Sequence, residues 1–566
     1  MTVELSDRIS HIKNNACKFT SIAVSASTCL TNRTGADTIT PEMNPGTKKM
    51  RIEFIFPDNL RPEDLQSTLQ DDKRIIAEPP RTIYRTYFDS FDWRLYLDGS
   101  LLEDSRDGNS HTLVLRSLQG EDRSPGLKLD TPPLFARDLP QGPLREQLEP
   151  LLEMRELVPR FRIRSRVTGL RILNRDEKTV AWLKIEENNL PRQRGIRSGK
   201  LDNRAVIIPV RGFAKPGKAM AKRLQQQGLI PAEDSLMLSV LAKLGEKPGS
   251  YTSKLNLKLD PAMRADQASK VILQRLLDIM LQNEAGTRKA ADTEFLHDFR
   301  VAIRRTRSAL SQIKAVFPTR IIDRYKIEFA WLGQMTSPSR DLDVYLLNFD
   351  DYRDSLPVAV RPDIEPLRSF LIRHQKAENK ALVKVLDSAR YARLIRNWRT
   401  FLEQPVNERS TLKNAGRPVS EVASQRIWRV FRRVIQEGDA ITADSPADDL
   451  HELRKTCKKL RYLMEFFASL YPSGNIKGLI QTLKILQDNL GDFQDYEVQV
   501  STLKTFSHQM VTEDTAPPDT LLAMGMLIDG LERRQHQARE AFAGRYAGFS
   551  QQKNQQRFRK LFASNH

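Results

Sequence analysis

Two segments of this chain, 154 residues apart, carry the same pattern of basic residues. Each begins with a histidine and places cations three, seven, eight and ten residues later. At about 100° per residue, the histidine and the cations at positions three, seven and ten lie within roughly 80° of one helix face. We therefore predict two equivalent basic helices, and infer a long, repetitive anion as ligand. The pattern comprises His297, Arg300, Arg304, Arg305 and Arg307 in the first segment, and His451, Arg454, Lys458, Lys459 and Arg461 in the second.

The repeat extends beyond these basic segments. With the same offset and no gaps, Trp331-Leu332-Gly333 aligns with Ile485-Leu486-Gln487, and Arg340-Asp341-Leu342-Asp343 aligns with Gln494-Asp495-Tyr496-Glu497. A constant offset over almost 50 residues predicts duplicated helical bundles related by a pseudo-twofold axis. The aligned acids could form a metal site, but we favour a role in capping a helix or orienting the motif arginines.

The basic row is separate from the apolar face of each predicted helix. In the first segment Leu296, Phe299 and Ile303 share one side, and the cations lie on another. Arginine offers phosphate a planar fork of donors, whereas lysine offers a compact charge. The alternative is a solvated face or cations paired with acids, and the repetition of the row favours an anion site. The histidines fit either polar core positions or phosphate donors, and the zinc-protease spacing is absent.

Charge and composition narrow the classes of partner and compartment. The chain of 566 residues has a net charge of +19, which favours polyanionic partners. It contains no run of 18 apolar residues, so we expect no membrane span. Three cysteines, Cys17, Cys29 and Cys457, form no disulfide framework, which fits a reducing cytoplasm. We expect residues 1–48 to be a disordered segment without a secretory signal, and a true start at Met43 or Met50 stays open.

The two parts of the chain differ in their periodicity. Residues 49–246 contain short alternating runs typical of strands, such as 83–88 and 161–173. Residues 247–251 are predicted to be a linker, and residues 252–566 are predicted to be all helical, with halves at about 252–405 and 415–566. In the second half the pattern predicts separate helices, including Ile476–Leu490 and Tyr496–Phe506.

The helical part resembles the CHAD domain, the conserved histidine α-helical domain, over about residues 252–566. The resemblance rests on Leu296–Arg307 followed by Arg340-Asp341-Leu342-Asp343-Val344. It implies two pseudo-symmetric four-helix bundles around a basic channel that binds inorganic polyphosphate through the residues of both basic segments. The second segment departs from the first by having Lys458-Lys459 in place of two arginines, which keeps charge but loses the bidentate geometry. Further candidates on flanking helices are Lys326, Lys380 and Lys484.

The N-terminal part resembles a CYTH domain, an antiparallel β-barrel with a triphosphate tunnel. The resemblance rests on Tyr87-Phe88-Asp89-Ser90-Phe91-Asp92. Arg162, Arg164 and Arg166 alternate, so they share one side of a strand, which suits such a tunnel or a solvated sheet face. The fold class expected for the chain is therefore α+β, a barrel followed by an all-α domain. The tunnel candidates are Glu53, Arg116, Arg162, Arg164, Arg166, Lys184 and Glu186.

The CYTH resemblance is incomplete where that family would bind metal. The family opens with Glu-x-Glu-x-Lys, whereas this chain has Arg51-Ile52-Glu53-Phe54-Ile55, which retains one motif residue. A site lacking a carboxylate would bind Mg²⁺ poorly. We therefore predict a degenerate barrel without cofactor, and Mg²⁺ or Mn²⁺ would be needed only if activity persists.

These features lead to three functional hypotheses. The first is a non-enzymatic polyphosphate-binding protein in a bacterial cytoplasm, recruited to polyphosphate granules. The alternatives are a metal-dependent triphosphatase on the barrel and, less favoured, a nucleic-acid binder, since the motif helices lack an aromatic row and no strand carries an aromatic pair among basic residues. The preferred chain length, the oligomeric state, the ligand of the barrel and the physiological role stay open.

Overall fold

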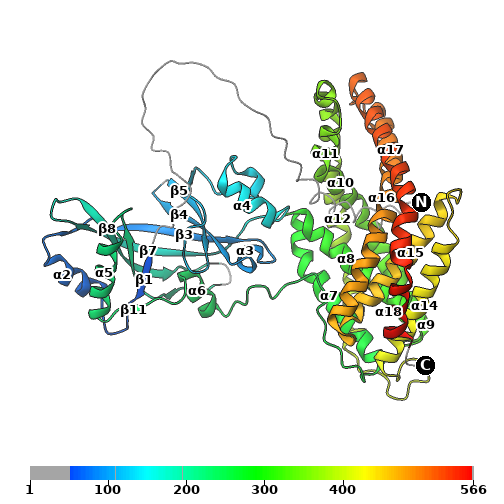
Figure 1. The fold of residues 1–566 in the computed structure, drawn as a ribbon, viewed down its shortest axis with the longest axis horizontal. Coiled ribbons are helices and arrows are strands. Elements are labelled where there is room, and N and C mark those ends of the chain that lie inside the picture. The colour runs from blue at the N-terminus through cyan, green and yellow to red at the C-terminus, as the bar shows by residue number, and fades with distance from the viewer. Residues whose placement is uncertain (1–50, 109, 194–195, 564–566) are drawn as a thin grey trace. The chain divides into compact units, whose positions relative to one another are not determined.

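A computed structural model describes residues 51–108, 110–193 and 196–563 (Figure 1). The expectations for residues 1–48, including Cys17 and Cys29, lie outside these ranges. The described residues up to Thr252 form one compact unit, and those from Ser253 form another. Among the described helices, none is long and apolar enough to cross a lipid bilayer.

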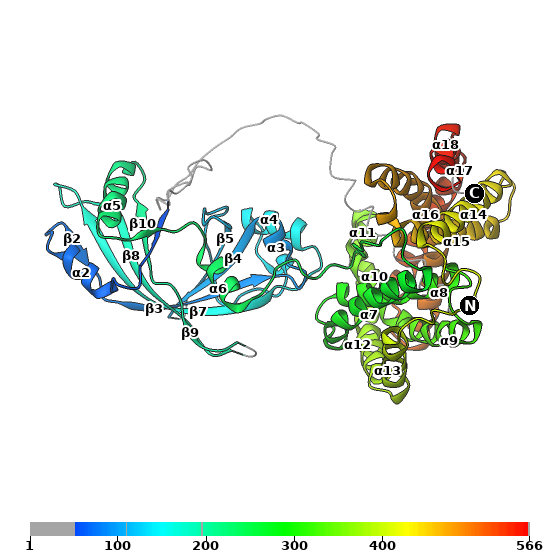
Figure 2. The same ribbon diagram turned by 90° about the horizontal axis from the view of Figure 1, so that it is seen from below.

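The N-terminal unit is built on one curved antiparallel sheet (Figure 2). Its main path of paired strands runs in the order β11-β1-β10-β8-β7-β3-β4-β5-β6. Short strands β2 and β9 pair with β7 and β8. The strands are β1 Ile52–Ile55, β2 Ile75–Ala77, β3 Arg81–Asp89, β4 Ser100–Asp107, β5 Ser110–Ser117, β6 Leu127–Leu129, β7 Val158–Leu173, β8 Thr179–Leu190, β9 Gly199–Lys200, β10 Arg204–Pro209 and β11 Ile230–Pro231.

Short helices cover parts of both faces of this sheet. On the outer face, α2 and α5 pack against β1, β8 and β10, and α4 packs against β4 and β5. On the inner face, α6 packs against Tyr87, Leu101 and Ile163. A strip of the outer face lies between the two covered regions. The helices are α2 Pro62–Gln70, α3 Arg94–Leu97, α4 Pro143–Leu152, α5 Ala214–Gln226 and α6 Leu236–Leu244.

The C-terminal unit is all helical, which confirms the predicted order of an antiparallel sheet followed by a helical unit. Both basic segments lie on helices, the first on α8 and the second on α15. The helices are α7 Ala265–Lys289, α8 Thr293–Gln312, α9 Thr319–Met335, α10 Ser337–Leu347, α11 Phe349–Asp354, α12 Glu365–Leu386, α13 Ala389–Glu403, α14 Val419–Asp439, α15 Ala447–Phe466, α16 Ser473–Thr512, α17 Pro518–Ser550 and α18 Gln552–Phe562.

The two halves differ where α9 and α10 of the first correspond to α16 of the second. The prediction of separate helices at Ile476–Leu490 and Tyr496–Phe506 was wrong, because both ranges lie in the continuous 40-residue helix α16. In the first half Pro338 lies in the first turn of α10. Proline lacks an N–H and clashes with the preceding turn, so α9 cannot run on. Its counterpart at the 154-residue offset is Asp492, which leaves α16 unbroken.

The helical unit contains two hydrophobic cores, and each draws on both halves of the repeat. Helix α16 passes through both: Leu486 and Leu490 belong to the larger core, and Val500 and Leu503 belong to the smaller. Between them, α16 presents buried polar residues instead. We call the polar residues at this level the polar layer, and they comprise His297, Arg300, Arg340, Asp341, Asp343, His451, Arg454, Gln494 and Asp495.

Candidate functional site

The two basic helices α8 and α15 are in contact, and one carboxylate joins them. Arg305 Nη2 lies 3.0 Å from Glu465 Oε2, and Arg461 Nε lies 3.4 Å from Glu465 Oε1. Arg305 also donates to the carbonyl of Ser253 at 2.9 Å. The fold therefore brings the two predicted cation rows together, while these two arginines are held by protein groups.

The motif histidines have equivalent partners in the two halves. Nδ1 of His297 lies 3.3 Å from Arg340 Nη2, and Nδ1 of His451 hydrogen-bonds with Oε1 of Gln494. Both partners are 43 residues further along the chain. Of the two roles open in the sequence, these contacts support a polar position that links each basic helix to the next part of its bundle.

The arginines three residues after each histidine are buried in the polar layer. Arg300 donates to the Gly333 carbonyl at 3.0 Å and to the Thr336 hydroxyl at 2.5 Å. Arg454 is 2% exposed, and its Nη2 lies 3.1 Å from Asp495 Oδ1. These contacts connect α8 to the junction of α9 and α10, and α15 to α16. The ion pair also supports the expectation that the repeated acids orient motif arginines.

Asp341 is the counterpart of Asp495, and its environment is different. Its Oδ1 is buried and has no hydrogen-bond partner among the described residues. Burial raises the pKa of this carboxyl to about 7, although Arg300 and Arg340 act to lower it. The first half of the polar layer therefore contains a carboxyl group that changes charge near neutral pH.

The remaining row cations differ in accessibility. Arg304, Arg307 and Lys459 are partly exposed, whereas Lys458 is buried. Within the described ranges, Arg307 and Lys459 form no ion pair or hydrogen bond. The flanking lysines are dispersed: Lys326 on α9 lies 3.7 Å from Asp323, Lys380 is exposed on α12 and Lys484 is half-buried on α16.

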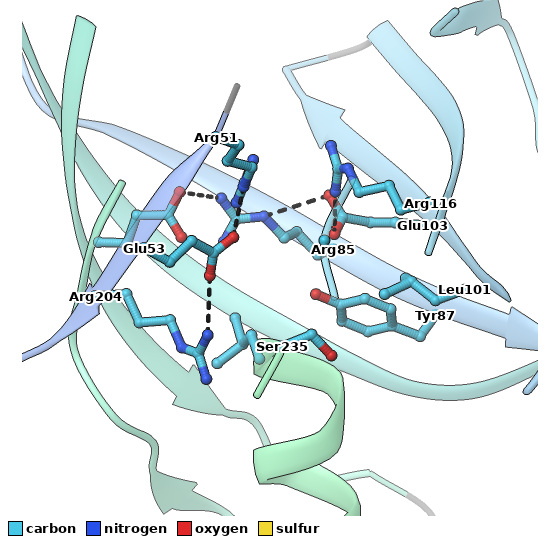
Figure 3. Close-up of a pocket in the computed structure, with 12 residues that line it drawn as sticks. Arg51, Glu53, Arg85, Tyr87, Leu101, Glu103, Arg116, Arg204 and Ser235 are labelled. Atoms are coloured by element: carbon cyan, nitrogen blue, oxygen red, sulfur yellow. Dashed lines mark hydrogen bonds and ion pairs between the residues drawn. The ribbon is translucent and has the colours of Figure 1, made fainter. Parts of the chain in front are cut away.

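The N-terminal sheet encloses a charged cavity on its inner face (Figure 3). Glu53 contacts Arg51 at 2.5 Å and Arg204 at 2.9 Å. The predicted tunnel residues Glu53, Arg116 and Glu186 line this cavity, and Lys184 lies beside Glu186. The complete lining is Arg51, Glu53, Arg85, Tyr87, Leu101, Glu103, Arg116, Gly120, Glu186, Arg204, Ser235 and Leu236.

The other two carboxylates of the cavity are also paired with arginines. Arg85 Nη2 lies 2.6 Å from Glu186 Oε1, and Arg116 Nη1 lies 2.8 Å from Glu103 Oε2. Burial alone would raise the pKa of Glu103, but Arg116 and Arg85 lower it well below its usual range. The space left between these side chains is about 20 Å³, which is close to the volume that one water needs.

This cavity does not fit the divalent metal that the CYTH resemblance implies. Glu53, Glu103 and Glu186 each contact an arginine, and a divalent cation needs several oxygen ligands free of competing cations. Among the described residues, no three histidine, cysteine or acidic side chains lie together in a way that could bind a metal. We therefore derive no metal-dependent step at this cavity.

The prediction that Arg162, Arg164 and Arg166 face the tunnel was wrong. All three are exposed, and the alternate residues Ile163 and Ser165 are the buried ones. Alternation places the arginines on one side of β7 but does not say which side, and on this strand Ile163, Ser165 and Val167 occupy the inner side. The sequence did not predict that Arg51, Arg85, Glu103 and Arg204 line the cavity. One available signal was that Arg85 and Tyr87 alternate on β3 and therefore share a face.

The fold and the paired basic helices define a two-unit protein, an antiparallel sheet unit followed by a duplicated helical bundle. The model of the CHAD domain family matches residues 271–504. The chain therefore contains a CHAD domain at residues 271–504, and the predicted resemblance is confirmed over those residues.

Known relatives resemble parts of the chain. It is 27% identical over 314 residues to uncharacterised proteins from two strains of Mycobacterium tuberculosis, which covers 53% of this chain and 55% of each relative. The chain thus matches about half the length of these relatives. A CHAD domain from the plant Ricinus communis is 24% identical and has a TM-score of 0.44, covering 53% of this chain and 96% of its own. A putative adenylyl cyclase from Hippeastrum, described as having dominant triphosphatase activity, is 12% identical with a TM-score of 0.25, covering 36% of this chain and 100% of its own.

Proposed function

We propose that the helical unit binds long-chain inorganic polyphosphate along the contacting helices α8 and α15. The observation that carries this proposal is the pairing of two equivalent cation rows, joined at Glu465, in which Arg304, Arg307 and Lys459 keep partly exposed charges. The match of residues 271–504 to the CHAD domain supports the same ligand. We propose that Arg300 and Arg454 act indirectly, by fixing the helices that carry the binding residues.

The physical basis is repeated contact with a regularly charged chain. Cations one helical turn apart can reach neighbouring phosphates, and each phosphate bound by a cation releases counterions. By analogy with nucleic acids, affinity should therefore fall steeply as salt rises. The net charge of +19 adds a long-range attraction that speeds encounter with a polyanion.

The test compares two triple variants of the full chain that lose the same charge. The first is Arg304→Gln, Arg307→Gln and Lys459→Gln. The control is Lys376→Gln, Lys504→Gln and Arg533→Gln, three exposed cations elsewhere in the helical unit. We expect the first variant to bind long-chain polyphosphate at least about tenfold more weakly and with a shallower salt dependence, and the control to stay within about threefold. Equal losses of polyphosphate affinity in both variants would mean that only net charge matters, and would contradict the proposal.

The cellular part of the proposal is recruitment to polyphosphate granules in a bacterial cytoplasm. A fluorescent fusion of the full chain should localise to granules, and the fusion carrying the first triple variant should be diffuse. Localisation that is unchanged in that variant would show that other surfaces direct it.

A triphosphatase in the N-terminal cavity is the less favoured function. The arginine-paired carboxylates and the volume of about 20 Å³ weigh against binding of a metal–triphosphate complex there. We expect phosphate release from tripolyphosphate with Mg²⁺ or Mn²⁺ to match that of a Glu53→Gln variant. Clear turnover by the unmodified protein, lost in that variant, would establish the enzyme instead.

A further inference from the structure

An exposed tyrosine lies among arginines on the outer face of the N-terminal sheet. Tyr84 on β3 is 41% exposed. Its paired neighbour on β4 is Arg106, and its paired neighbour on β7 is Arg164. Directly paired residues in an antiparallel sheet project to the same face with their Cβ atoms about 5 Å apart. The three side chains therefore form a row, which we call the Tyr84 platform, with the aromatic ring between two cations.

The platform continues along β7. Arg162 and Arg166 lie on the same face as Arg164, because alternate residues of a strand share a side. Successive arginines on this strand are about 6.7 Å apart, which is comparable to the spacing of phosphates in an extended single strand. Arg162 donates to Thr86 at 3.3 Å, and Arg166 contacts Glu187 at 3.3 Å. Arg164 makes no ion pair with any residue in the described ranges.

A cleft of about 600 Å³ opens beside Tyr84 on this face. Its volume is within the usual range for small-molecule sites. Phe88 and two prolines, Pro132 and Pro159, provide apolar lining, and Arg106 and Arg162 provide charge. The buried carboxylate of Asp104 also lines the cleft and lies 2.9 Å from Nδ1 of His111. The cleft therefore combines apolar surfaces that suit a planar ring with cations that suit an anion.

We propose that the Tyr84 platform and its adjoining cleft bind single-stranded nucleic acid, with a base stacked on Tyr84 and the backbone phosphates along Arg162, Arg164 and Arg106. Exposed aromatic rings on a sheet flanked by cations are the elements that single-strand binding requires. An inorganic polyanion would use the arginines and gain nothing from the ring. The platform escaped notice in the sequence because Tyr84, Arg106 and Arg164 are neighbours across strands and not along one strand.

This site is on the face opposite the charged inner cavity and is independent of the proposed polyphosphate function. The experiment measures binding of fluorescent 12-nucleotide single-stranded RNA and DNA of uniform sequence to the full chain. Tyr84→Ala and Arg164→Gln remove the ring and one cation, and Tyr84→Phe restores a stacking surface. Phe213→Ala is the matched control, since Phe213 is a similarly exposed aromatic residue of the same unit.

We expect Tyr84→Ala to weaken oligonucleotide binding at least about fivefold, with Tyr84→Phe and Phe213→Ala within about twofold of the unmodified protein. Polyphosphate binding should be unchanged in Tyr84→Ala. Oligonucleotide binding that survives Tyr84→Ala, or that is undetectable in the unmodified protein at physiological salt, would overturn the proposal. Neither result would bear on the proposed polyphosphate site of the helical unit. Tighter binding of RNA or of DNA would identify which nucleic acid the platform prefers.

Discussion

The guanidinium of Arg305 and the carboxylate of Glu465 form an ion pair at 3.0 Å that links the first basic helix to the second. Glu465 also accepts Arg461, so a single acid neutralises part of both cation rows. The same contact therefore stabilises the helix pair and lowers its positive potential. These two effects can be separated by experiment.

We expect Glu465→Gln to change stability and polyphosphate affinity in opposite directions. Loss of the carboxylate leaves Arg305 and Arg461 close together and should cost on the order of 1–2 kcal/mol of unfolding free energy. It also frees two cations, so polyphosphate should bind several-fold more tightly at low salt. Chemical unfolding and a binding titration check the pair of effects. Weaker binding by a folded variant would mean that Arg305 and Arg461 do not face the ligand.

Arg454→Gln should be far more damaging to stability than Lys459→Gln. The first change removes the cation that pairs with Asp495, a residue that is 2% exposed. Breaking such a buried pair lowers the free energy of unfolding by about 3–5 kcal/mol. The second removes a partly exposed charge and should cost no more than about 0.5 kcal/mol. The Lys459 variant should bind polyphosphate more weakly because it loses a cation that contacts the ligand, and not because the helices shift. Similar stability of the two variants would contradict the positioning role given to Arg454.

Asp341 should make the helical unit less stable as pH rises from about 4 to 7. Its folded-state pKa is raised to about 7, so in this window the folded protein holds a proton that the unfolded chain has lost. The contribution of Asp341 to the free energy of unfolding is thus greatest at low pH. It declines by at most about 1.4 kcal/mol per pH unit as the pH rises. Comparison of unfolding free energies of the unmodified protein and Asp341→Asn from pH 4 to 8 isolates this slope. A constant difference across the range would be inconsistent with a raised pKa.

Glu103→Gln should destabilise the N-terminal unit at neutral pH. Arg116 and Arg85 would lose a buried partner, at a cost of about 3–5 kcal/mol. Because the pKa of Glu103 is lowered, its contribution is present above the unfolded pKa near 4.3 and is lost only in strong acid. Calorimetric unfolding of the full chain at pH 7 tests this. The control Glu187→Gln breaks an exposed pair and should cost less than about 1 kcal/mol.

The sequence predicted the helical unit better than the sheet unit. The constant offset between His297 and His451 located both basic helices because helix faces follow from local periodicity. It could not show that Arg300 and Arg454 are buried while Arg307 and Lys459 are partly exposed, since this depends on how neighbouring helices pack. Pro338 is a local signal that ends α9. The second half has Asp492 at the equivalent position, and the prediction of two helices there was wrong because it assumed that both halves break at the same place.

Less of the sheet unit could be predicted from the sequence. Alternation grouped Arg162, Arg164 and Arg166 correctly, yet the face they occupy depends on how the sheet curves and which side the helices cover. Pairs across strands, such as Arg85 with Glu186, join residues 101 positions apart and leave no local signal. The degenerate opening motif at Glu53 is visible in the sequence, whereas the ion pairs of Glu53 with Arg51 and Arg204 form only in the folded sheet.

Both hydrophobic cores of the helical unit mix residues from the two halves of the repeat. A fragment ending near residue 405 would expose the apolar surface that the second half covers, so one half cannot be expected to fold alone. A chain with a single copy of the repeat could close such cores only by associating with a second copy of itself. The two halves therefore associate as the subunits of an obligate homodimer do, but their covalent connection makes the association independent of protein concentration.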